Sequence, residues 1–82
     1  MTVNLPPNFH GGVLISCGSG SKNDQTVTID EKGLGEAHGC SQTPPRLKIL
    51  RDGVDVRPLD TEPPIWNTTD TGTMAGVSFS VP

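Results

Sequence analysis

The stretch RLKILRDGVDVR, residues 46–57, gives the clearest fold signal in the chain, that of a β-hairpin. Alternating runs flank Asp52-Gly53, and an Asp-Gly pair between such runs favours a type I′ turn, because both turn residues take positive φ at low cost. A two-residue loop also fixes the register. The predicted pairs are Arg51–Val54, Leu50–Asp55, Ile49–Val56 and Lys48–Arg57, with Ile49 and Val56 on the core side.

Further short strands are predicted on either side of this hairpin. Residues 13–17 form a mostly apolar run, which indicates a buried strand. Residues 25–31 alternate between apolar and polar side chains, which predicts a half-buried strand. A turn at Lys32-Gly33 then leads into a returning strand over residues 34–40. Val77, Phe79 and Val81 alternate with serines and predict a closing strand deep in a sheet.

These strands predict one all-β domain spanning residues 1–82. Five or six short strands separated by turns, with no capped helical spacing, favour a small antiparallel sandwich or open barrel closed by a disulfide. Residues 1–10 contain Pro6-Pro7 and are predicted to form an extended N-terminal arm. Residues 59–73 contain further prolines and little periodicity, so we expect a long proline-rich loop there.

The two cysteines, Cys17 and Cys40, are predicted to form a disulfide. Closing a loop of about 24 residues stabilises a chain by about 3 kcal/mol, which is comparable to the whole stability of so small a domain. Disulfides persist in oxidising compartments, so we expect an extracytoplasmic protein, whether secreted, periplasmic or on the cell surface, acting after signal removal. The alternative is a pair of buried free thiols in a cytosolic protein.

Charge and hydropathy argue against two classes of partner. The formal net charge of −3 and an isoelectric point near 5.0, with the basic residues scattered, disfavour nucleic-acid binding. The longest apolar run covers residues 13–15, too short for a membrane span.

The residues that could support catalysis or metal binding do not form a specific pattern. A nucleophile needs a positioned base, and the only histidines are His10 and His38. The thiol and imidazole ligands of His10, Cys17, His38 and Cys40 suit zinc chemically, but no zinc-knuckle spacing is present. Asp52 and Asp55 lack the pattern of a calcium loop. We therefore predict a protein that is not an enzyme and holds no metal or cofactor, with a metal-binding domain as a minor alternative.

The segment Pro63-Pro64-Ile65-Trp66 is the predicted partner-binding surface. Prolines stiffen a loop and lower the entropic cost of presenting a large apolar side chain to a protein partner. The competing interpretation is that Trp66, the only tryptophan, folds back onto a core short of aromatics. The sequence thus favours a small, monomeric binding or structural module. The alternative is a hydrolase inhibitor that inserts the loop of residues 59–73.

Overall fold

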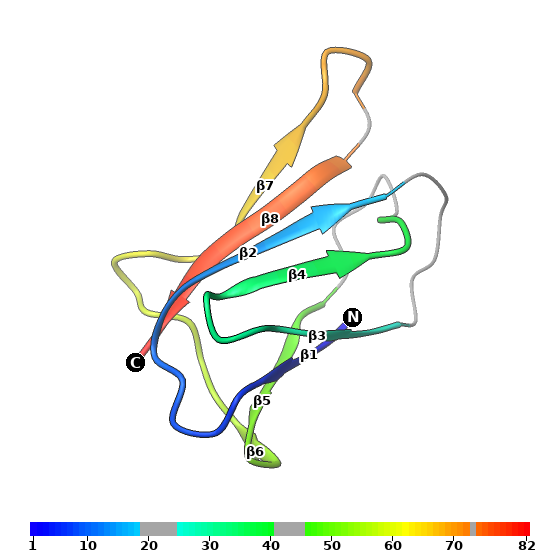
Figure 1. Ribbon diagram of the computed structural model, residues 1–82. Coiled ribbons are helices and arrows are strands. Elements are labelled where there is room, and N and C mark those ends of the chain that lie inside the picture. Colours follow the sequence, from blue (N-terminus) through cyan, green and yellow to red (C-terminus); the bar gives the residue numbers. More distant parts are fainter. Residues whose placement is uncertain (19–24, 41–45, 73) are drawn as a thin grey trace.

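The described part of the chain is built entirely from β-strands. The computed structural model describes residues 1–18, 25–40, 46–72 and 74–82, and within these ranges it contains no helix. The strands are β1 (Thr2–Leu5), β2 (Gly11–Cys17), β3 (Thr26–Thr28), β4 (Leu34–Ala37), β5 (Lys48–Arg51), β6 (Val54–Asp55), β7 (Ile65–Thr68) and β8 (Met74–Val81). They form two four-stranded sheets, in the orders β3-β1-β5-β6 and β4-β2-β8-β7 (Figure 1).

Both sheets are mixed, which corrects the antiparallel architecture predicted from the sequence. Strand β1 pairs in parallel with β3 and with β5, and β2 pairs in parallel with β4. Strand β8 pairs antiparallel with β2 and β7, and β5 with β6. The parallel pairs arise because the chain changes sheet after each of its first four strands. Two successive strands of one sheet are therefore separated by a strand of the other sheet, and the chain enters the second of them in the same direction as the first. The all-β class is confirmed.

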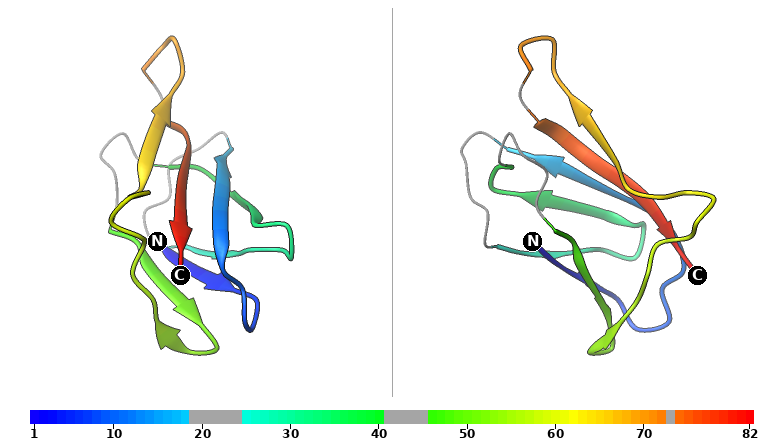
Figure 2. Two further views of the ribbon diagram at one scale, coloured as in Figure 1. Left: turned by 90° about the vertical axis from the view of Figure 1, so that its left-hand side faces the viewer. Right: turned by 180° about the vertical axis from the view of Figure 1, so that it is seen from behind.

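Two strands lie in segments where the sequence predicted none, so the described residues form eight strands instead of five or six. Strand β1 belongs to the expected N-terminal arm, where Val3 and Leu5 alternate with polar residues and are buried. Pro6 follows this strand directly. It lies outside the strand and marks its end, so it does not disrupt the pairing of residues 2–5. Strand β7 lies within residues 59–73, and the turn after it (residues 69–72) projects beyond the rest of the molecule (Figure 2).

The predicted hairpin of residues 46–57 is confirmed as β5 and β6. Asp52 and Gly53 have φ values of 55° and 77°, as a type I′ turn requires. The ladder contains the predicted pairs Arg51–Val54 and Leu50–Asp55. The amide of Val56 also donates to the carbonyl of Ile49 at 2.9 Å, and both side chains pack into or against the core.

The predicted hairpin between residues 25–31 and 34–40 is replaced by a crossing between sheets. Asp30 Oδ1 accepts hydrogen bonds from the amides of Lys32 (2.8 Å) and Leu34 (2.9 Å), which closes a tight turn. The amide of Leu14 donates to the carbonyl of Gly33 at 2.8 Å, so the turn is anchored on β2. The chain therefore leaves β3 in one sheet and continues as β4 at the edge of the other.

One apolar core is shared by the two sheets. Its most completely buried side chains come from both: Val3, Ile15, Val27, Ile29, Val77 and Val81. Burial of these aliphatic side chains is the main favourable term in the stability of such a fold.

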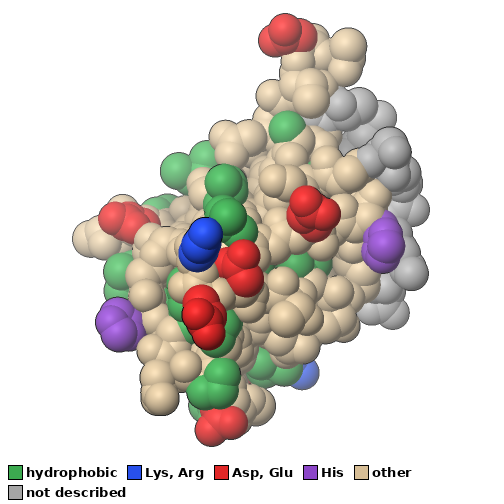
Figure 3. All heavy atoms as spheres, in the orientation of Figure 1, with side chains coloured by type: hydrophobic (Ala, Val, Ile, Leu, Met, Phe, Trp, Pro, Cys, Tyr) green, Lys and Arg blue, Asp and Glu red, His purple; other side chains and the backbone are tan. Residues whose placement is uncertain are grey.

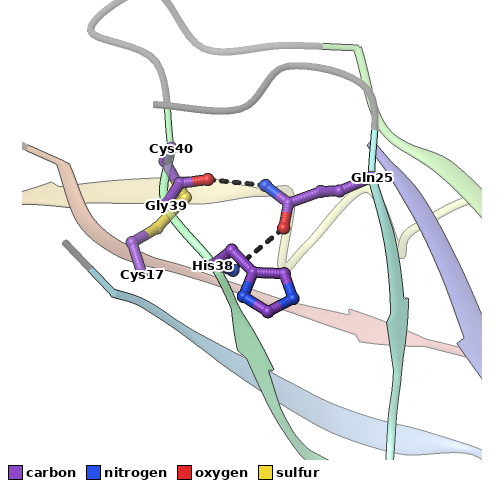
Figure 4. The surroundings of a disulfide bond; sticks show 5 residues. All are labelled: Cys17, Gln25, His38, Gly39 and Cys40. Atoms are coloured by element: carbon purple, nitrogen blue, oxygen red, sulfur yellow. Dashed lines mark hydrogen bonds between the residues drawn. A yellow bond between two sulfur atoms is a disulfide. The ribbon is translucent and has the colours of Figure 1, made fainter. Parts of the chain in front are cut away.

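The disulfide between Cys17 and Cys40 joins two neighbouring strands of one sheet. Its Cα atoms are 5.6 Å apart, a normal separation for such a bond. Cys17 ends β2 and Cys40 follows β4, and these two strands pair directly with each other. The buried side chain of Gln25, just before β3, accepts from the amide of His38 at 3.0 Å and donates to the carbonyl of Gly39 (Figure 4). This amide links the disulfide-bonded segment to the other sheet.

Substitution of Gly33 tests the crossing turn, with Gly72 as a matched control. Both glycines have φ of +86°, so alanine at either position costs about 1–2 kcal/mol in backbone strain. A Cβ at Gly33 would also overlap the carbonyl oxygen of Gly12 on β2, whereas a Cβ at Gly72 meets nothing. We expect Gly33→Ala to lower the free energy of unfolding by about 2 kcal/mol more than Gly72→Ala. Urea denaturation monitored by circular dichroism measures both, and equal losses would contradict the close approach of the turn to β2.

Candidate docking face

Exposed aliphatic side chains are aligned across the outward face of the sheet β4-β2-β8-β7. The register places Leu14 opposite Leu34 on one side and opposite Ser78 on the other, and Ser78 opposite Ile65. Leu34, Leu14 and Ile65 are 47%, 46% and 57% exposed. We call Leu34, Leu14, Ser78 and Ile65 the outer row; it runs across all four strands of this sheet.

The alternation of each strand determines which side chains reach this face. On β2, Val13 and Ile15 point into the core, so Leu14 between them must point outward. The same alternation on β7 turns Ile65 outward and Trp66 inward. The outer row is therefore a consequence of strand register and not of a flexible loop.

The outer row lies in a depression with a volume of about 500 Å³. Leu14, Leu34, Ile65, Pro63 and Ser78 contribute to its walls. Figure 3 shows hydrophobic side chains gathered on this face, with charged side chains beside them. Isolated exposed aliphatic residues are common, but three in one row across a sheet form an apolar strip, which here is interrupted by Ser78 between Leu14 and Ile65.

Charged groups border the strip. Lys32 and Glu62 line the main depression, and the Glu62 carboxylate accepts a hydrogen bond from the Ser80 hydroxyl. A smaller neighbouring depression of about 340 Å³ shares Leu14 and Leu34 with the first, and it is also lined by Asp30 and Glu36. The border of the strip is thus mainly acidic.

The structure divides the predicted binding segment between two faces. Pro63 and Ile65 line the outer depression. Pro64 and Trp66 line a second depression of about 580 Å³. That depression lies beside β5 and β6, and its other walls come from Leu47, Ile49, Asp55, Val56, Arg57 and Pro58. Trp66 is half-buried and packs against the core, as the competing interpretation of the sequence expected.

Three of the remaining candidate residues, Cys17, Cys40 and His10, have partners within the protein. Cys17 and Cys40 bond to each other, so neither sulfur is left as a zinc thiolate. His10 pairs through Nδ1 with the carbonyl of Asn8 at 3.1 Å. Among the described residues, no group of three or more His, Cys, Asp or Glu side chains could hold a metal ion. Within the same ranges, no helix is long and apolar enough to cross a membrane.

Leu14 and Leu34 were missed by the sequence analysis. Leu14 sits in the apolar run of residues 13–17, which was predicted to be buried throughout, and Leu34 was placed in a hairpin with residues 25–31. The outward position of Leu14 could have been inferred by applying strict alternation to that run. Its alignment with Leu34 depends on a parallel pairing that has no local signal.

Comparison of the chain with protein-family models, with curated proteins and with solved structures finds no match. The functional argument therefore depends on the site itself.

Alanine substitutions at Ile65 and Trp66 test the division of β7 between two faces. Trp66→Ala removes a large side chain packed on the core and should lower the free energy of unfolding by about 2 kcal/mol. Ile65→Ala trims a solvent-facing side chain and should change it by no more than about 0.5 kcal/mol. Urea denaturation followed by circular dichroism gives both values. A larger loss for Ile65→Ala than for Trp66→Ala would reverse the assignment of faces.

Proposed function

We propose that this protein is a non-enzymatic binding module that docks a protein partner on the outer row. The observation that carries the proposal is the alignment of Leu34, Leu14 and Ile65, all about half exposed, on one sheet face. Aliphatic side chains held on a sheet lose little conformational entropy on binding, which favours their use as contact residues. We also infer that the two sheets form a small sandwich and that the module is monomeric before it binds.

The proposed location is extracytoplasmic. The Cys17–Cys40 disulfide supports it, since such bonds persist in oxidising compartments and are rare in the cytosol. The small core makes this cross-link valuable, because a chain of 82 residues has little hydrophobic stability to spare.

The hydrolase-inhibitor alternative would use a different part of the molecule as its binding surface. It requires the segment of residues 59–73 to enter an enzyme, and the turn of residues 69–72 within it projects from the molecule (Figure 2). Nearer its start, this segment is tied to β8: the amide of Leu59 donates to the carbonyl of Ser80 at 2.8 Å, and the amide of Ser80 donates to the carbonyl of Glu62 at 3.2 Å. An inhibitor would therefore depend on the projecting turn, and a docking module on the outer row.

Selection of phage-displayed random peptides on the oxidised protein tests the proposal. We expect enriched peptides to bind Leu14→Thr at least about tenfold more weakly than the unchanged protein, because the substitution removes the central apolar contact while keeping a strand-forming residue. Val54→Thr is the matched control, since Val54 is an equally aliphatic residue, 65% exposed, on the other sheet.

Two results would count against the docking face. The first is a set of enriched peptides that bind Leu14→Thr as well as the unchanged protein. The second is binding that is insensitive to Leu14 but abolished by Thr71→Ala in the projecting turn, which would favour the inhibitor alternative.

A further inference from the structure

The charges around the outer row point to the chemistry of its partner. On β4, Glu36 lies two residues after Leu34 and therefore points to the same face. It pairs with Ser16 of β2, which lies two residues after Leu14. Glu36 and Ser16 thus belong to a second row that lies parallel to the outer row, two residues further along each strand. The carboxylate of Glu36 is exposed at the β4 end of this row. Side chains two residues apart on a strand are separated by about 7 Å, so a ligand on the outer row reaches Glu36 within one or two of its own residues.

Acidic groups outnumber basic ones at this border. The two depressions that share Leu14 and Leu34 are lined by the acids Asp30, Glu36 and Glu62, and by one base, Lys32. Within the described ranges, the carboxylate of Glu36 has neither an ion-pair nor a hydrogen-bond partner, and its side chain is exposed. It is therefore available to a ligand without the loss of an internal contact.

Apart from Lys32, the basic residues of the described chain lie elsewhere. Four of them lie on β5 or beside the β5–β6 hairpin, in the other sheet: Arg46, Lys48, Arg51 and Arg57. One of these is held internally, since Arg51 donates to the carbonyls of Phe9 and Pro82. The field at the outer row is thus set by its own acids, with Lys32 as the only opposing charge among the lining residues.

We propose that the occupant of the outer row is an apolar segment of another protein flanked by lysine or arginine. This inference rests on the proposed docking function and adds the chemical class of the partner. The aliphatic residues of the segment cover Leu34, Leu14 and Ile65, and its basic flanks lie beside Glu36 at one border and Glu62 at the other. Ion pairs at the rim of an interface contribute mainly to specificity and to the rate of association, so flanking charge selects among apolar segments that would otherwise bind alike.

The test is selection from a peptide library with a randomised aliphatic centre and flanks drawn equally from Lys and Glu. Lysine is expected to outnumber glutamate at the flanks by at least about tenfold after selection on the unchanged protein, and affinity should fall as NaCl is raised from about 50 to about 500 mM. Selection on Glu36→Gln should reduce the lysine preference severalfold. Asp52→Asn is the matched control, because it changes the net charge equally, keeps a residue suited to positive φ, and lies at the distant β5–β6 turn.

The outcomes separate this inference from the docking function. Peptides that need Leu14 but show no flank preference, or a preference that Asp52→Asn reduces as much as Glu36→Gln does, would overturn the basic-flank chemistry and leave the docking face standing. Peptides that bind without regard to Leu14 would overturn both. A concentration-dependent dimer in sedimentation that Leu14→Thr abolishes would assign the face to a second copy of the chain, and so would also overturn the proposal.

Discussion

The turn from Asp30 to Leu34 is the constraint on which the arrangement of the two sheets depends. The Asp30 carboxylate accepts from two amides of the turn, and Gly33 supplies the positive φ that carries the chain around. The carbonyl of Gly33 then accepts from Leu14, which fixes the turn against β2. From this anchor point the chain continues along β2. The parallel pairing of β2 with β4 follows directly.

This pairing also produces the proposed docking face. The register that begins at the turn sets Leu34 beside Leu14, and the antiparallel pairing of β2 with β8 and of β8 with β7 extends the same row to Ile65. The disulfide closes the far end of the β2–β4 pair, and Gln25 links that end to the other sheet. Both ends of the pair are therefore held by specific bonds, which restrict the movement of β4 relative to β2, as the proposed docking requires.

How much of this could be predicted depended on whether the decisive signal was local. The Asp52-Gly53 hairpin and the buried alternation of Val77, Phe79 and Val81 were predicted because their signals span only a few residues. The disulfide was predicted because the chain has just two cysteines.

The parallel pairs were missed because they join segments far apart in sequence. The same Asp, Gly and alternating residues that mark a hairpin also suit a crossing turn between sheets. Strands β1 and β7 were missed because each is short and lies next to prolines, which led to the prediction of an extended arm and a loop in those segments. At the candidate site, Ile65 was named from the sequence, whereas its partners Leu14 and Leu34 required the register.

The most direct test of the account is a nuclear Overhauser spectrum of the oxidised protein with labelled methyl groups. The account predicts cross-peaks between the methyl groups of Leu14 and Leu34, together with backbone contacts of the parallel pairing of residues 14–17 with residues 34–37. Backbone cross-peaks of an antiparallel hairpin between residues 26–30 and 35–39, without contacts between Leu14 and Leu34, would contradict it. In that case the crossing turn, the parallel pair in the sheet β4-β2-β8-β7 and the outer row would all have to be abandoned.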